Sequence, residues 1–221
     1  MSVSAALDAV IGVAQSALEG LATLLTPATG TLAAALAIVV FTVAVRLLIS
    51  PLAWLQARSA KRGAALAPQI AILRERHRDD PVRLAGETLA LQRANGASPF
   101  AAVLPALAQA PFFMLMYHVV RPGAGAPTGV LAGHLLGVPL TAHLATGLPV
   151  FSVLLGLAGL LAWWSSRRAR RSMPADNPLG GILTRLPYLT VAAVACLPLA
   201  GGLYLVTSAA WTALEQLVLR R

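Results

Sequence analysis

Residues 31–52 read TLAAALAIVVFTVAVRLLISPL, and this stretch decides the fold class of the chain. It contains one charged side chain, Arg46, within an otherwise apolar run. A helix of about 20 apolar residues crosses a hydrocarbon core of about 30 Å. The stretch therefore predicts a membrane-spanning helix, and we expect Pro51 to end it because proline interrupts the helical hydrogen-bond ladder.

The composition extends this prediction to the whole chain. Only 11% of the 221 residues are charged and 57% are hydrophobic, whereas a soluble domain carries about 25% charged residues. We predict an all-α integral membrane protein with five transmembrane helices. These are expected at residues 31–52, 99–120, 148–164, 183–199 and 202–219, which form the core at 31–221. Residues 1–30 are expected to form an amphipathic helix in the outer membrane interface.

The charged loops predict the orientation. Eight Lys and Arg residues lie in 55–98 and five in 165–187, whereas the loop 121–147 contains only Arg121. Cytoplasmic loops are enriched in Lys and Arg, so this alternation favours an N-outside, C-inside topology. Segments 55–98 and 165–182 would then be cytoplasmic and 121–147 an outer loop. Because the net charge of +9 is concentrated in these loops, we expect no sequence-specific nucleic-acid binding.

The first polar segment has the pattern of a helical hairpin. Leu66, Ile70 and Leu73 recur at helical spacing. Asp79-Asp80-Pro81 then combines a side chain that can cap a helix with a proline at the first helical position. Asn95-Gly96 is typical of a helix end. We therefore predict two antiparallel helices within 55–98.

Arg46 is the strongest candidate functional residue. An arginine at the bilayer centre costs about 2.5–3.5 kcal/mol on insertion scales. One interpretation is an arginine that snorkels to the inner interface. The other is an arginine that faces a water-filled cavity, in which Thr42, one turn earlier, would add a polar surface. Glu215 is the sole carboxylate within a predicted span and can pair with Arg46 or Arg220, or lie at the interface.

Other polar residues give weaker signals. Gln109 lies between Pro105 and Pro111 in the predicted second span, where an interhelical hydrogen bond and a cavity-lining role are equally good interpretations. His118, His134 and His143 have no metal-ligand spacing, and Cys196 stands alone. The sequence contains no catalytic motif. We therefore expect no enzyme, no cofactor and no metal.

Together, the motifs resemble the YidC/Oxa/Alb family of membrane protein insertases. The similar elements, which run from about residue 36 to 219, are FTVAVRLLISPL at 41–52, LAPQI at 66–70, Asp79-Asp80-Pro81, the Pro, Gln, Pro, aromatic and Tyr pattern at 104–117, LGVPL at 136–140, and the final hairpin from Leu197-Pro198 through Tyr204 to Ser208 and Gln216. Their order and spacing resemble a minimal bacterial member of the actinobacterial type. Leu205 departs from the pattern, because the family usually has an aromatic residue there.

The resemblance implies a hydrophilic groove that is open to the cytoplasm and to lipid but sealed outside. Arg46, Thr42, Gln109 and Tyr204 would line it, and nascent membrane proteins would be its clients in a bacterial cell membrane. Further candidate partners are the Sec translocon and the ribosome. An alternative function is a small anion transporter or channel that uses Arg46, and a third is a scaffold in which Arg46 is structural.

Overall fold

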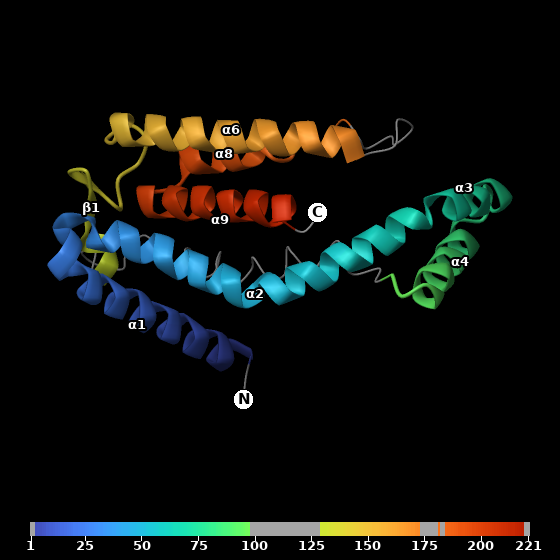
Figure 1. Cartoon of the computed structure of the whole chain (residues 1–221), viewed down its shortest axis with the longest axis horizontal. Helices are drawn as coiled ribbons and strands as arrows, with labels where there is room; N and C mark the ends of the chain where they lie inside the picture. The colour runs from blue at the N-terminus through green and yellow to red at the C-terminus, as the bar shows by residue number, and fades with distance from the viewer. Residues whose placement is uncertain (1–2, 98–128, 173–180, 182–183, 219–221) are drawn as a thin grey trace. The chain divides into compact units, whose positions relative to one another are not determined.

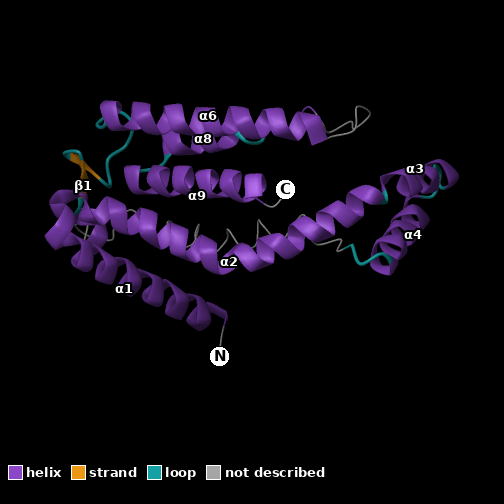
Figure 2. Ribbon diagram, in the orientation of Figure 1, coloured by secondary structure: helices purple, strands orange, loops and turns teal. Residues whose placement is uncertain are grey.

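The computed structural model describes residues 3–97, 129–172, 181 and 184–218. These residues are mostly helical (Figures 1 and 2). They divide into two compact units, residues 1–47 with 115–221, and residues 48–114. The predicted second span at 99–120, including Gln109, lies outside the described residues.

The first unit begins with α1 (Val3–Thr29), the short 3-10 helix η1 (Gly30–Leu32) and the start of α2 (Ala33–Ala65). A helix is thus found over most of the predicted region at 1–30, and it includes Pro27. Its place in the outer membrane interface stays a prediction. The break occurs at Gly30, whose φ of 55° is a left-handed value that glycine adopts without steric cost. The expected end of the next helix at Pro51 is wrong, because α2 continues to Ala65. A proline removes one hydrogen bond, which a long helix can tolerate.

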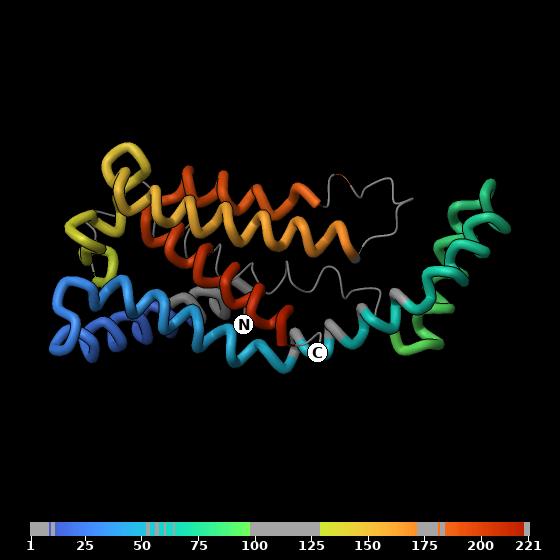
Figure 3. The backbone as a smooth tube through the Cα atoms, turned by 45° about the horizontal axis from the view of Figure 1, so that its top comes forward, coloured from blue at the N-terminus to red at the C-terminus, as the bar shows by residue number. Residues whose placement is uncertain are grey.

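Three helices pack together at the C-terminal end of the chain. They are α6 (Leu148–Ser172), α8 (Tyr188–Cys196) and α9 (Leu199–Val218). Each contacts the other two, and Figure 3 shows them side by side. Phe151, Leu199 and Val194 are fully buried. Gly202 lies at this contact, where an added Cβ would be 3.4 Å from a methyl group of Val194, an ordinary van der Waals distance.

The predicted outer loop contains η3 (Gly129–Ala132) and a β-hairpin of β1 (His134–Leu135) and β2 (Val138–Pro139). The sequence did not predict this short β-hairpin, but the described residues are otherwise mostly helical, which is consistent with the predicted all-α class. Leu136 and Gly137 connect the strands with φ values of 52° and 82°, as a two-residue type I′ turn requires. The loop then caps α9. The first two amides of α9, at Leu199 and Ala200, donate hydrogen bonds to the loop carbonyls of Ala142 and Leu140, each at 2.9 Å. These amides would otherwise have no partner at the start of the helix.

The second unit contains the rest of α2 together with α3 (Ala67–Arg76) and α4 (Pro81–Ala94). The predicted helical hairpin is confirmed for α3 and α4, which contact each other. The Asp80 carboxylate accepts a hydrogen bond from the Arg83 amide at 3.0 Å, and Pro81 occupies the first turn. Gly96 has a φ of 64° directly after the helix end. Residues 55–65, however, continue α2 and do not belong to the hairpin.

Two described segments are long and apolar enough to cross a membrane, namely Gly12–Pro51 and Leu148–Arg171. The second includes the predicted span at 148–164 and extends it by two turns. The predicted span at 202–219 falls on α9, which begins after a break from α8 at Leu197-Pro198. That α9 crosses the membrane stays a prediction. The predicted helix at 183–199 is shorter, because residues 184–187 form turns before α8 begins. At 1.5 Å per residue, α8 covers about 14 Å.

Candidate functional site

Arg46 continues the buried face of α2. Ala34, Ile38 and Thr42 precede it at intervals of four residues and are all buried. In a helix, residues four apart lie one above the other on the same face. The half-buried Arg46 side chain therefore starts from the face of α2 that packs inside the first unit. Arg46 thus lies on an interior face of α2, and its role in a water-filled cavity stays a prediction.

Two partners of Arg46, Tyr204 and Ser208, come from α9. The Arg46 guanidinium donates a hydrogen bond to the Ser208 hydroxyl oxygen. The Tyr204 phenol interacts with both the Ser208 hydroxyl and the Arg46 guanidinium. Tyr204 and Ser208 lie one turn apart on α9, and their exposed fractions are 6% and 3%. The site is thus a buried polar cluster of Arg46, Tyr204 and Ser208 that joins two helices far apart in sequence.

Thr42 is buried, with an exposed fraction of 3%, and its hydroxyl forms a hydrogen bond within α2. The hydroxyl donates to the Ile38 carbonyl at 2.6 Å, a local bond that serine and threonine often make within helices. Thr42 therefore lies on the same face as Arg46, as its spacing predicts.

Two contacts of the last helix, α9, were not predicted from the sequence. Ser208 was recognised as part of a motif but not as the partner of Arg46, although its spacing of four from Tyr204 places both on one face of α9. The guanidinium of Arg168, on α6, donates to the Gln216 carbonyl at 2.9 Å. Since the last carbonyls of a helix have no partner within it, Arg168 provides a C-terminal cap for α9.

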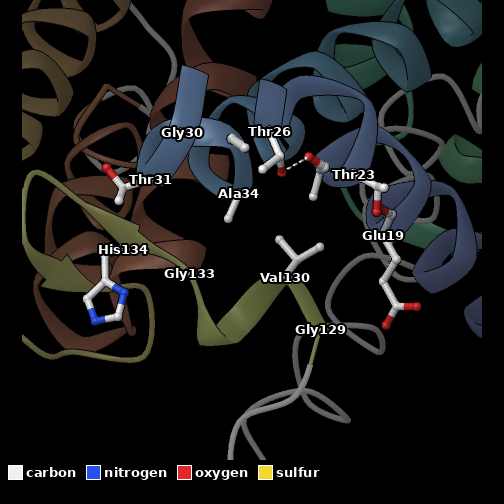
Figure 4. A pocket seen from close by; sticks show the side chains of 12 residues that line it. Glu19, Thr23, Thr26, Gly30, Thr31, Ala34, Gly129, Val130, Gly133 and His134 are labelled. Atoms are coloured by element: carbon white, nitrogen blue, oxygen red, sulfur yellow. Dashed lines mark hydrogen bonds between the residues drawn. The ribbon is translucent and has the colours of Figure 1, made fainter. Parts of the chain in front are cut away.

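A separate pocket of about 550 Å³ lies between α1, the start of α2 and the outer loop, as Figure 4 shows. Thr23, Thr26, Thr31, Glu19 and His134 contribute its polar lining. The hydroxyls of Thr23 and Thr26 donate to carbonyls of their own helix. Within the described part of the chain, no group of three His, Cys, Asp or Glu side chains could hold a metal ion. His118, one of the three histidines considered above, lies outside that part.

Comparison with known proteins identifies the family. The sequence profile described as "60Kd inner membrane protein" matches residues 25–221. A protein of Granulibacter bethesdensis named "Membrane protein insertase YidC" is 44% identical over 84 residues, which are 38% of this chain and 14% of that protein. The protein of the same name from Mycobacterium tuberculosis is 31% identical over 209 residues, which cover 71% of this chain and 56% of that protein.

A third relative with this name, from Streptomyces avermitilis, is 33% identical over 110 residues, which are 49% of this chain and 26% of that protein. This chain thus spans about half the length of the mycobacterial relative and less of the other two. The profile match includes both helices of the Arg46 cluster. The chain therefore belongs to the 60Kd inner membrane protein family, which is the YidC/Oxa/Alb family that its motifs resemble.

Proposed function

We propose that this chain is a membrane protein insertase and chaperone, which moves nascent membrane segments into the bilayer through a hydrophilic groove. Membership of the 60Kd inner membrane protein family supports this proposal, as do relatives named membrane protein insertase. The observation that carries the mechanism is the Arg46 guanidinium inside the first unit, bonded to the Ser208 hydroxyl.

The proposed topology has five spans, with the N-terminus outside and the C-terminus inside, in a bacterial cell membrane. Two described segments meet the length and hydropathy of a span. The alternating charges of the loops support the orientation, because basic loops remain in the cytoplasm. Since α8 covers about 14 Å, the fourth crossing in this topology includes the turn residues before α8.

In the proposed mechanism, Arg46 attracts the acidic residues that flank a client's apolar segment. Two unit charges 4 Å apart attract by about 4 kcal/mol at an effective dielectric constant of 20. A polar groove also shortens the hydrocarbon that the client's hydrophilic flank has to cross. Burial of the client's apolar segment in lipid then drives release, so the chain acts as a non-enzymatic insertase without a cofactor. Gln109, Thr42 and Tyr204 are proposed to line the groove.

The test is insertion of a single-span client with a short acidic N-terminal tail into vesicles that contain the full chain. Arg46→Ala should reduce insertion of this client, while a matched client with Asn in place of Asp should insert as before. Arg46→Lys should retain part of the activity, because the charge remains although the planar guanidinium is lost. Equal insertion of the acidic client by the wild type and Arg46→Ala would contradict the proposed role.

Photo-crosslinking tests the path of the client. A photoreactive phenylalanine derivative at position 204 replaces one aromatic side chain with another and should crosslink to the stalled client. The same residue at position 136, at the exposed tip of the β-hairpin, is the control and should not crosslink if the groove is sealed outside. Absence of a crosslink at 204 would count against the insertase. Chloride flux into proteoliposomes would instead favour the anion transporter.

A further inference from the structure

The exposed surface of α6 changes from apolar to basic toward the C-terminal end of the helix. Val153, Leu157 and Leu160 are exposed apolar side chains at helical spacing. Trp163 follows them with an exposed fraction of 44%, and exposed arginines complete the surface at positions 167, 170 and 171. The opposite surface of α6 is buried and includes Phe151, Leu154, Ala158 and Ala162.

α6 is long enough to cross one bilayer. At 1.5 Å per residue, Trp163 lies about 22 Å from Leu148, where α6 begins, and Arg171 lies about 34 Å from it. The hydrocarbon core is about 30 Å thick, and the headgroups lie beyond it. Tryptophan is enriched where hydrocarbon meets headgroup. The order of apolar residues, tryptophan and arginine therefore follows the order of acyl chain, interface and phosphate in a lipid.

Adjacent Trp–Arg pairs at the end of α6 have different roles. The Arg168 guanidinium lies 5.3 Å from the Trp164 ring centroid, and its Nη2 caps α9 through the Gln216 carbonyl. The Arg167 guanidinium lies 4.3 Å from the Trp163 ring centroid, on the exposed surface.

Stacking of this kind uses the flat face of the guanidinium. The N–H groups at its edge stay available, and two parallel N–H groups suit the oxygens of a phosphate. Across the described residues, no carboxylate forms an ion pair with the arginines at 167, 170 and 171.

We propose that Trp163, Arg167, Arg170 and Arg171 form a binding site for the headgroup phosphate of an anionic phospholipid. The tryptophan ring supports the guanidinium of Arg167, and the other two arginines add positive charge one turn further along α6, nearer the lipid phosphate. This inference goes beyond insertion, because no client takes part in it.

The test measures which lipid lies beside Trp163. A variant with Trp163 as its sole tryptophan is made by replacing Trp54, Trp164 and Trp211 with Phe, and the full chain is reconstituted in phosphatidylcholine vesicles. Brominated acyl chains quench tryptophan fluorescence on contact. They are supplied in a small fraction of either phosphatidylglycerol or phosphatidylcholine. Each arginine near the surface contributes a factor of about five in attraction to anionic lipid, so we expect at least a fivefold preference for phosphatidylglycerol.

Matched variants separate this site from general charge. Replacing Arg167, Arg170 and Arg171 with Gln should abolish the preference. Gln at Arg74, Arg76 and Arg78, three exposed arginines of the other unit, removes the same charge and should leave the preference intact. Replacing 167, 170 and 171 with Lys should preserve part of it, since the charge remains although the stacked guanidinium and its paired N–H groups are lost.

Three outcomes would overturn the proposal. The first is equal quenching by the two brominated lipids in the background variant. The second is a preference that survives the triple Gln change on α6. The third is a preference lost to the same extent in the Lys and Gln variants, which would mean that substitution distorts the helix end and that positive charge does not bind the lipid.

Discussion

The hydrogen bond between Arg46 and Ser208 can be measured as a coupling energy between α2 and α9. Ser208→Ala removes the hydroxyl acceptor from a buried position and changes the side-chain volume little. Arg46→Met removes the donor. The Arg46→Met variant alone is not interpretable, because removing a buried charge also regains an insertion cost of about 2.5–3.5 kcal/mol. A double-mutant cycle cancels this contribution and isolates the pair.

Two magnitudes bracket the expected coupling. Hydrogen bonds between helices inside a membrane average about 0.6 kcal/mol in double-mutant cycles. A hydrogen bond that involves a charged group contributes about 1.5–3 kcal/mol. Arg46 also interacts with Tyr204, which can compensate in part when Ser208 is truncated. We therefore expect a coupling of about 1.5 kcal/mol, above the membrane average and at the lower end of the charged range.

The assay is unfolding of the purified full chain in mixed micelles with increasing denaturing detergent, followed by far-UV circular dichroism. Thr207→Val is the matched control, since its hydroxyl donates to the Leu203 carbonyl within α9 and makes no bond to Arg46 among the contacts described. Its free energy of unfolding should be the same with Arg46 and with Met at position 46. A coupling energy between Arg46 and Ser208 below about 0.3 kcal/mol would refute the inference that this hydrogen bond stabilises the packing of α2 against α9.

Three further changes test the local structure through the same unfolding measurement. Asp80→Ala should lower the stability of the hairpin by about 1 kcal/mol through loss of the N-cap, whereas the adjacent Asp79→Ala should change it by less than about 0.5 kcal/mol. Gly133→Ala should destabilise the chain by about 1–3 kcal/mol, because the added Cβ would overlap the Cβ of Ala34. The control Gly156→Ala should not destabilise it, because a Cβ there meets nothing within 4 Å. Leu136→Asn should stabilise the β-hairpin by about 0.5–1 kcal/mol, since asparagine tolerates a positive φ; equal or lower stability would contradict this.

Helix boundaries that depend on residues within one turn of each other were predicted from the sequence. The cap at Asp80-Pro81 and the end at Asn95-Gly96 bound α4 as predicted, because capping depends on residues within one turn. The apolar surface that begins at Leu66 also predicted α3, although Leu66 itself precedes the helix and is buried. The spacing of Thr42 and Arg46 predicted their common face.

Three features were not predicted, each for a different physical reason. The sequence around Pro51 contains a helix breaker, but the propensity of the flanking residues for helix outweighs one lost hydrogen bond in α2. The β-hairpin was missed because each strand has two residues, too few for an alternating pattern, and Leu136 is an unusual residue for a positive φ. Ser208 was not chosen as a partner of Arg46 because 162 residues separate them.

The chemistry of the Arg46 partners bears on the proposed cycle. A bond from a guanidinium to a hydroxyl contributes about 1.5–3 kcal/mol, whereas a carboxylate at 4 Å attracts it by about 4 kcal/mol at an effective dielectric constant of 20. A client carboxylate can therefore compete with Ser208 for the guanidinium. If position 208 were an aspartate, a client carboxylate would only replace another carboxylate and would gain almost no binding free energy. Arg46 would then stay paired with position 208. In the proposed cycle, the bond to the Ser208 hydroxyl would hold the Arg46 side chain in position within the first unit and still allow an acidic group of the client to bind it and leave.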